Sequence, residues 1–370
     1  MPIENKDVDK LFEMMSKHDA SDLHLKAGAS PILRIHGSIR EVDAKPLKAR
    51  DLQSILFSML DADQRQRFDK NGDIDFAHGI PGLGRFRING FRQRGSISIA
   101  ARRVNVSIPS FQELHLPVES LRRIASLKQG LVLVAGATGS GKSTTLASII
   151  ETINSHRRCH VVTIEDPIEY LFTDKKSFIN QREVGIDVKD FDSALKTVVR
   201  QDPDIILIGE MRDAETFFTA LTAAETGHLV LSTIHSSSVP QTIGRILDLF
   251  PSDQHDQIRK GLVFNLKAVL CQKILPSIHE SSARIPATEI LFSTPSVQKL
   301  IAKKLDEKLS DAVRTGTEDG MMDFNQSIFK LVQDGYISKK IALSNSPNPD
   351  QLKMNLQGIF LDDQRRILGS

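Results

Sequence analysis

A glycine-rich stretch carries the clearest chemical signal in the 370-residue sequence. It reads Gly136-Ala137-Thr138-Gly139-Ser140-Gly141-Lys142-Ser143, the pattern of a phosphate-binding P-loop, and a helix is predicted to begin near Lys142. Glycines at this spacing let successive backbone N–H groups converge on the phosphates of a nucleotide, and the helix N-terminus adds its positive end. The alternative is a tight glycine turn without a ligand. The residues predicted to hold ATP are Gly136, Thr138, Gly139, Ser140, Gly141, Lys142, Ser143 and Thr144.

Polar residues also follow three other apolar runs. Four such runs alternate with helix-length segments, at residues 131–135, 160–164, 205–208 and 229–231. This alternation is typical of a parallel sheet that is buried on both faces, and ligands of such sheets bind outside the carboxyl ends of the strands. The first run leads to the glycine-rich stretch, and the others lead to Glu165, Glu210 and His235. We therefore expect these three side chains close to the bound phosphates.

Each of the three side chains has a predicted role in phosphoryl transfer to water. This reaction needs a Mg²⁺ site, a group that orients the attacking water, and cations near the developing charge. Glu210 ends a Walker B-like strand, with Glu where Asp is commoner, and is expected to hold Mg²⁺ together with Ser143. Glu165 is the candidate that orients or deprotonates the water, and His235 is the candidate sensor of the γ-phosphate. Structural roles at the strand ends are the alternative for all three.

Charge and composition narrow the classes of partner. The 48 basic and 46 acidic residues give a net charge of +2, which is weak for a protein that grips a nucleic acid. The two cysteines, Cys159 and Cys271, lack the Cys-x-x-Cys spacing of a metal site, and the N-terminus does not resemble a signal peptide. No apolar stretch approaches the roughly 20 residues of a membrane span. We expect a cytoplasmic protein that reaches a membrane only through a partner.

The length predicts two domains with an added helical tail. Val8, Leu11, Phe12 and Met15 recur at helical spacing, and alternating residues at 85–89 and 96–99 predict strands of a half-solvated sheet. One helix is expected over 49–68, and the prolines at 109 and 117 indicate a linker. The predicted segments are an N-terminal α+β domain, a linker, an ATPase domain and a helical C-terminal region, at 1–105, 106–117, 118–293 and 294–370.

Several motifs in order along the chain resemble the secretion ATPase superfamily and, within it, the PilT/PilU family of motors that disassemble type IV pili. The strands of the N-terminal domain resemble that family at Ser21–Leu25 and Gly84–Arg87. The nucleotide domain resembles the family's Asp box and following stretch, its Walker B block and its His box at 163–170, 181–185, 200–213 and 226–235.

The resemblance implies a PAS-like N-terminal domain, a RecA-like ATPase domain with a mostly parallel sheet, and a homo-hexamer with ATP between the two domains. It also implies that arginines of the N-terminal domain approach the phosphates, and the positions are Arg85, Arg87, Arg94 and Arg102. These arginines would otherwise only coat the polar face of a sheet. ATP turnover would change the angle between domains and pull on the pilus through a platform protein of the inner membrane.

Retraction is favoured over pilus extension because the extension ATPases carry extra N-terminal domains and a four-cysteine zinc site, whereas this chain has two isolated cysteines. The sequence departs from the retraction pattern at Pro295–Ile301. The chain could therefore be either the main PilT type or the accessory PilU type of retraction motor. A paralogous ATPase is a further expected partner. Two other readings also stay open. One is another RecA-like motor for secretion or DNA translocation, and the other is a nucleotide-gated scaffold.

Overall fold

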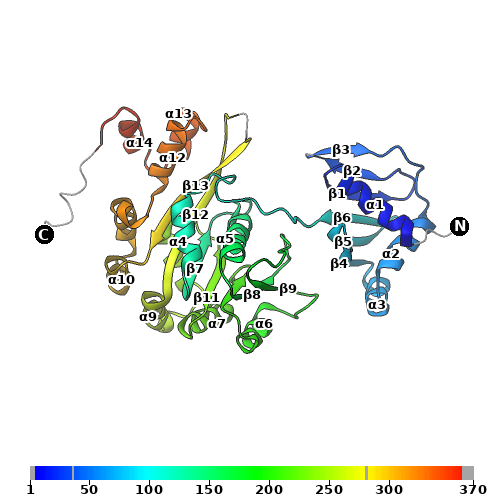
Figure 1. Ribbon diagram of the computed structural model, residues 1–370, viewed down its shortest axis with the longest axis horizontal. Helices are drawn as coiled ribbons and strands as arrows, with labels where there is room; N and C mark the ends of the chain where they lie inside the picture. Colours follow the sequence, from blue (N-terminus) through cyan, green and yellow to red (C-terminus); the bar gives the residue numbers. More distant parts are fainter. Residues whose placement is uncertain (1–4, 36, 280–281, 361–370) are drawn as a thin grey trace. The chain divides into compact units, whose positions relative to one another are not determined.

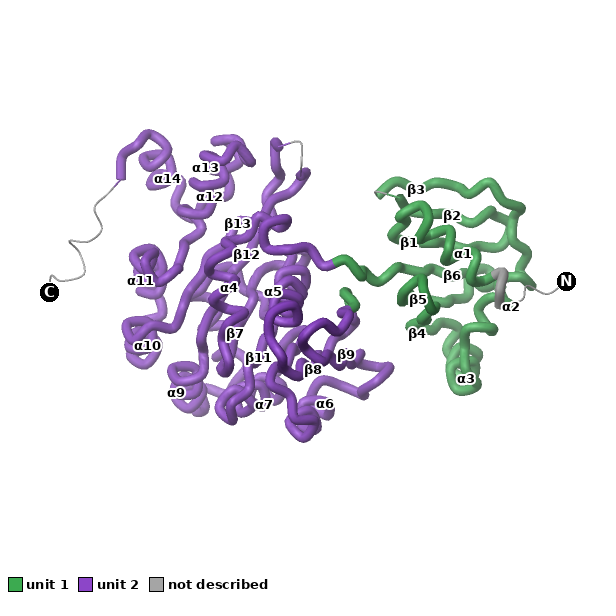
Figure 2. The backbone as a smooth tube through the Cα atoms, in the orientation of Figure 1, with its two compact units in different colours: residues 1–107, 169–171 green, residues 108–168, 172–370 purple. Residues whose placement is uncertain are grey.

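The computed structural model describes residues 5–35, 37–279 and 282–360. The chain divides into two compact units, and each is described by itself (Figure 2). Unit 1 comprises residues 1–107 and 169–171, and unit 2 comprises residues 108–168 and 172–370. The short segment 169–171 joins unit 1 because it pairs with Asn105: Leu171 N donates to the Asn105 carbonyl at 2.8 Å, and Asn105 N donates to the Glu169 carbonyl at 3.3 Å.

Unit 1 is a six-stranded sheet in the order β3-β2-β1-β6-β5-β4, and every neighbouring pair is antiparallel (Figure 1). Its strands are β1 (Ala20–Lys26), β2 (Ile32–Ile35), β3 (Ser38–Glu41), β4 (Asp73–Ile80), β5 (Gly84–Gln93) and β6 (Ser96–Arg103). Its helices are α1 (Asn5–Lys17), α2 (Ala49–Met59) and α3 (Ala62–Asn71). The predicted first helix and the two predicted strands are confirmed.

The helices of unit 1 cover the apolar side of its sheet. Phe86 and Ile88 of β5 are buried with Phe12 of α1, whereas Arg85 and Arg87, which alternate with them on the strand, are half-buried. Gly90 lets α2 come close, because a Cβ at this position would lie 2.7 Å from a methyl carbon of Leu56. The other side of the sheet is therefore left for polar side chains.

The single helix predicted over 49–68 is wrong, because the structure has two helices there. Helix α2 ends before Leu60, whose backbone is extended, and Asp61 caps α3. The Asp61 side chain accepts from Gln64 N at 2.8 Å, and the Gln64 side chain accepts from Asp61 N at 3.1 Å. This reciprocal capping box stabilises the start of a new helix at the point where the apolar spacing of α2 is interrupted.

Unit 2 is a seven-stranded sheet in the order β13-β12-β7-β11-β10-β8-β9, with β13 antiparallel to β12 and every other pair parallel. The four predicted apolar runs are the strands β7 (Gly130–Ala135), β8 (His160–Glu165), β10 (Ile205–Ile208) and β11 (Leu229–Ile234). Three strands were not predicted, namely β9 (Phe178–Glu183), β12 (Leu266–Pro276) and β13 (Arg284–Phe292). Edge strand β9 is polar and partly exposed, so it lacks the apolar run of a buried strand.

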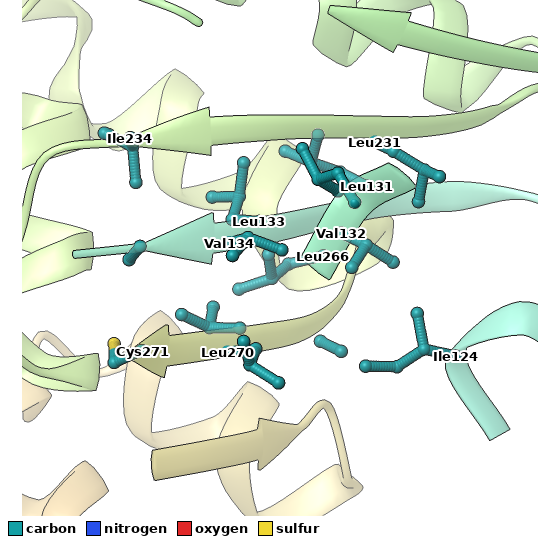
Figure 3. Packing of buried hydrophobic residues seen from close by; sticks show 14 of the residues in the cluster. Ile124, Leu131, Val132, Leu133, Val134, Leu231, Ile234, Leu266, Leu270 and Cys271 are labelled. Atoms are coloured by element: carbon teal, nitrogen blue, oxygen red, sulfur yellow. The ribbon is translucent and has the colours of Figure 1, made fainter. Parts of the chain in front are cut away.

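The centre of unit 2 is an apolar core around β7. Every residue of β7 and β11 is buried, and helices α5 (Lys142–His156) and α7 (Ala214–Glu225) both pack on these two strands. Figure 3 shows Leu131 and Leu133 of β7 among Leu231 of β11 and Leu266 and Leu270 of β12. Each such side chain contributes about 1.5–3 kcal/mol on burial, so the core fixes the strand ends that carry the polar groups. The remaining helices beside this sheet are α4 (Val118–Ser126), α6 (Phe191–Val198), α8 (Val239–Leu247) and α9 (His255–Asn265).

The chain after Thr294 is helical, as predicted, within the part that the structure describes. Its helices are α10 (Pro295–Ala302), α11 (Leu309–Thr315), α12 (Phe324–Gln333), α13 (Lys339–Asn345) and α14 (Pro349–Leu356), and residues 361–370 lie outside the described residues. Hydrogen bonds fasten this region to α4 of the same unit, because Ser120 Oγ donates to the Gly320 carbonyl at 2.8 Å and Arg123 Nη1 donates to the Asp319 carbonyl. Among the described residues, none of the helices combines the length and the apolar character of a membrane span.

Candidate nucleotide-binding site

The glycine-rich stretch forms the loop between β7 and α5. Gly139 and Gly141 have φ angles of 77° and 87°, a region that favours glycine, and Gly141 directly precedes the first residue of α5. Gly136 has no room for a side chain, because a Cβ would lie 2.4 Å from Ser140 Oγ. All eight predicted ATP-binding residues therefore lie in one strand–loop–helix unit whose helix N-terminus can face an anion.

Lys142 lies over the beginning of this loop. Its Nζ donates to the carbonyls of Gly136 and Ala137 at 2.9 and 3.1 Å. Ser143 is exposed in the first turn of α5, directly after Lys142. The ammonium and the hydroxyl thus lie on successive residues at the helix N-terminus, where a phosphate and its Mg²⁺ would need them.

Gln272 of β12 braces the loop from the neighbouring strand. Its Nε2 donates to the Ser140 carbonyl at 2.7 Å, and its Oε1 accepts from Thr145 Oγ1 at 2.8 Å. The side chain is buried, and a Cβ on Gly141 would lie 2.7 Å from its Nε2. Sequence reasoning missed Gln272, and the local signal was one amide within a largely apolar strand that also carries Lys267 and Lys273.

The register of the parallel strands brings the predicted polar groups to one edge of the sheet. Ala135 of β7 lies opposite Ile234 of β11, and Ile208 of β10 lies opposite both Ser232 of β11 and Ile164 of β8. The strands therefore end at similar heights, and the groups that follow them share the edge where the glycine-rich loop lies. This is the edge that the strand-end argument predicted.

Glu210 and His235 are in direct contact at this edge. His235 Nε2 lies 2.8 Å from Glu210 Oε1, and Arg212 Nη2 lies 2.7 Å from Glu210 Oε2. The Glu210 side chain is only 18% exposed, whereas that of Arg212 is 71% exposed. The hydrogen bond and the negative charge of Glu210 raise the pKa of Arg212. Sequence reasoning assigned no role to Arg212, although its position two residues after Glu210 was a usable signal.

Glu165 is held by two donors from adjacent strands. Thr163 Oγ1 and Gln181 Nε2 donate to the same oxygen, Glu165 Oε1, at 2.7 and 3.1 Å. A Cβ on Gly209 would lie 3.4 Å from the Glu165 Cα, so the end of β10 passes close to this residue. Sequence reasoning placed Gln181 in a family motif but gave it no contact with Glu165.

The four candidate arginines of unit 1 do not form one group. Arg87 of β5 lies opposite Arg102 of β6, and Arg85 lies two residues before Arg87 on the same side of the sheet. Arg94 lies in the turn after β5, seven positions beyond Arg87 and roughly 20 Å away along the strand. The structure therefore brings Arg85, Arg87 and Arg102 near one another and leaves Arg94 apart.

Arg102 is paired within its own sheet. Its Nε donates to Asp22 Oδ1 at 2.7 Å, and Arg34 Nε lies 3.8 Å from Asp22 Oδ2. The Asp22 side chain is 10% exposed. Burial by itself would raise the pKa of Asp22, but the hydrogen bonds from Arg102 and Ser21 outweigh it, and the pKa lies below its ordinary value. The aspartate thus orients the Arg102 guanidinium on the open side of the sheet.

The predicted Mg²⁺ ligands are a hydroxyl from α5 and a carboxylate that follows β10. Mg²⁺ keeps several waters and is usually held by one or two protein groups together with substrate phosphates. Ser143 and Glu210 provide a donor set of this kind on the edge that the glycine-rich loop shares.

The chain matches known proteins over most of its length. The family model for type II/IV secretion system proteins matches residues 2–317. The type IV pilus retraction ATPase PilT of Pseudomonas aeruginosa is 38% identical over 93% of this chain and 99% of its own length. The type IV pilus ATPase PilU of the same organism is 37% identical, over 94% of this chain and 91% of its own length.

A solved structure agrees with these sequence matches. The crystal structure of the pilus retraction motor PilT with bound ADP is similar to this chain with a TM-score of 0.84 and 42% identity. The match covers 93% of this chain and 98% of that one. Both the N-terminal and the C-terminal units therefore have counterparts in a nucleotide-bound protein.

Proposed function

Because this chain belongs to the type II/IV secretion system protein family, we propose that it is an ATP-hydrolysing motor that powers retraction of type IV pili. The observation that carries the proposal is the shared sheet edge: the glycine-rich loop, the Glu210–His235 pair and Glu165 all follow neighbouring parallel strands. A phosphate-binding loop alone would fit many proteins. The added acids and the histidine supply the groups that hydrolysis needs.

The phosphates would bind the backbone N–H groups of the loop and the N-terminus of α5. Lys142 would exchange its contacts with the carbonyls of Gly136 and Ala137 for contacts with phosphate oxygens. Ser143 and Glu210 would hold Mg²⁺, which neutralises charge on the β and γ phosphates. His235 contacts Glu210, so a change at the γ-phosphate would reach both residues.

Hydrolysis would use Glu165 to orient the attacking water. The water oxygen bonds to the γ-phosphorus while the bond from that phosphorus to the bridging oxygen of ADP breaks, and Glu165 accepts a proton from the water. Arg87 and Arg102 are the preferred cations from unit 1, because they lie opposite each other on the open side of their sheet. Arg94 is the least favoured of the four.

The proposed assembly is a homo-hexamer in the cytoplasm, at the inner face of the cytoplasmic membrane, acting on a pilus platform protein. A paralogous ATPase is a further proposed partner. The identities to PilT and PilU differ by a single percentage point, so the proposal covers both the main and the accessory type of retraction motor. Nucleic acid is not proposed as a partner, given the net charge of +2.

The test is pilus retraction in living cells. We expect deletion of the gene to leave excess pili that retract rarely or slowly when the fibres are fluorescently labelled. Wild-type protein should restore retraction, and the Glu165→Gln variant at equal abundance should not. Unchanged pilus dynamics in the deletion strain would refute the pilus assignment, and DNA-stimulated ATP turnover of the purified protein with steep salt dependence would favour a DNA-translocating motor instead.

A further inference from the structure

Gln181 of β9 connects Glu165 to the backbone of Phe172, in the segment between β8 and β9. Its amide Nε2 donates to Glu165 Oε1 at 3.1 Å, and its amide Oε1 accepts from Phe172 N at 2.9 Å. Carboxylates only accept hydrogen bonds and a backbone N–H only donates, so this arrangement requires one side chain with both a donor and an acceptor. An amide meets that requirement, whereas a carboxylate or an apolar side chain does not.

The strand register explains why Gln181 reaches Glu165. Strands β8 and β9 are parallel, with Thr163 opposite Gln181 and Glu165 opposite Glu183. Residues two apart on a strand face the same side, so all four side chains lie on one face of this corner of the sheet. Thr163 and Gln181 therefore approach the same carboxylate oxygen from two strands, which restricts both the position and the rotation of the Glu165 carboxylate.

The amide oxygen of Gln181 binds Phe172, which borders a segment that pairs with another part of the chain. Phe172 directly follows residues 169–171, which pair with Asn105 near the end of unit 1. The Gln181 side chain thus lies between the strand end that carries Glu165 and the chain that leads away from it.

We infer that Gln181 is a positioning residue for ATP hydrolysis: it orients the Glu165 carboxylate toward the attacking water and ties it to the backbone at Phe172. The inference rests on the proposed catalytic role of Glu165. A misplacement of about 1 Å in a reacting group can cost roughly 100-fold in rate, so a lost orienting bond has a measurable effect. A donor to the charged carboxylate also favours its ionised form.

Two substitutions distinguish the effect of the hydrogen bond to Glu165 from the effect of the hydrogen bond from Phe172 N. Gln181→Leu removes both hydrogen bonds. Gln181→Glu keeps an acceptor for Phe172 N but loses the donor to Glu165 and sets a second negative charge beside it. Asn180→Leu is the matched control, because Asn180 is the adjacent residue of β9, faces the other side, and loses only its contact with His160.

We expect both Gln181 variants to lower kcat by about tenfold or more while KM for ATP stays within about twofold. The acid limb of the kcat–pH profile should move to higher pH in Gln181→Leu, and further in Gln181→Glu, because like charges cannot both ionise easily at this distance. Hydrogen exchange at Phe172 should speed up in Gln181→Leu and stay near wild type in Gln181→Glu. Asn180→Leu should leave all three measurements unchanged.

The inference is overturned if the acid limb stays at its wild-type position in both Gln181 variants, or if Asn180→Leu reproduces their kinetic changes. Glu165→Gln, measured in parallel, separates this result from the proposed function. An active Glu165→Gln enzyme refutes the catalytic role of Glu165 itself. An inactive Glu165→Gln enzyme together with a wild-type profile for Gln181→Leu refutes only the positioning role.

Discussion

The two units carry their charged groups in different places because their sheets are built differently. In unit 2 the parallel strands around β7 are buried on both faces, so polar side chains gather where the strands end. In unit 1 the helices cover one side of an antiparallel sheet, and Arg87, Arg102 and Asp22 lie on the other. The parallel sheet therefore concentrates its chemistry at an edge, and the antiparallel sheet spreads charge over a face.

Two buried carboxylates show the same difference. Asp22 of unit 1 is hydrogen-bonded by Arg102 and has a lowered pKa, even though burial acts in the opposite direction. Burial raises the pKa of Glu289 in β13 to about 7, although its Oε2 accepts from Val239 N at 2.7 Å. Asp22 on the open face is hydrogen-bonded by a cation, whereas for Glu289 in the core the burial and the negative charge of Asp323 outweigh the Val239 N–H and the positive charge of Lys273.

The largest effect that the comparison predicts is at the sheet edge of unit 2. We expect Lys142→Ala to reduce ATP turnover about 1000-fold, because the charge that meets the phosphates is lost. Steady-state phosphate release measures this. Lys128→Ala is the control, since this exposed lysine precedes β7 at the opposite end of the strand. Similar losses in the two variants would show that the effect does not depend on the edge.

Glu165→Gln should keep nucleotide binding while hydrolysis falls about 100-fold, since the amide cannot accept a proton from water. Fluorescent nucleotide titration and single-turnover hydrolysis measure the two properties separately. Hydrolysis at the wild-type rate would remove Glu165 from the proposed mechanism and would leave the Glu210–His235 pair as the functional part of the edge.

A smaller effect is expected on the open face of unit 1. Arg102→Ala should lower kcat about tenfold, as one charge-assisted hydrogen bond to phosphate is worth about 1.5–3 kcal/mol. Arg94→Ala should change it less than about twofold, because Arg94 lies in the turn at the far end of β5. If the two variants lower kcat equally in the same ATPase assay, Arg94 does not differ in function from the Arg87–Arg102 pair.

The smallest effect concerns stability and pH. Glu289 ionises with a folded pKa of about 7, above its ordinary 4.5, so the folded state binds more protons than the unfolded state between these values. The free energy of unfolding should therefore fall as pH rises through this window, and the loss should be complete above pH 7. Glu289→Gln should remove that part of the pH dependence and be more stable than wild type at pH 8 by roughly 1–3 kcal/mol.

Denaturant unfolding at pH 5 and pH 8 measures this difference. The Asp22→Asn variant provides the opposite case, because a lowered pKa contributes stability at neutral pH that is lost only as pH falls through the acidic range. If the free energy of unfolding depends on pH in the same way in wild type and Glu289→Gln, the pKa of Glu289 does not differ from that of a solvated glutamate.

The glycine-rich loop, the four central strands and the polar residues that follow them could all be predicted from the order of residues along the chain. Each of these depends on local order along the chain: a run of apolar residues, a turn, and the residue that comes next. The capping box at Asp61 was equally local, and the expectation of one continuous helix overlooked it. Local patterns were sufficient because strand ends in a parallel sheet share an edge whatever the strand order is.

Which side chains meet across strands became visible only once the strands were paired in space. Gln272 contacts Ser140 over 132 positions, Arg102 contacts Asp22 over 80, and Gln181 contacts Glu165 over 16. These contacts depend on which strands are neighbours and in what register they pair. Strand order and register come from the packing of the whole core, and no stretch of sequence contains that information alone.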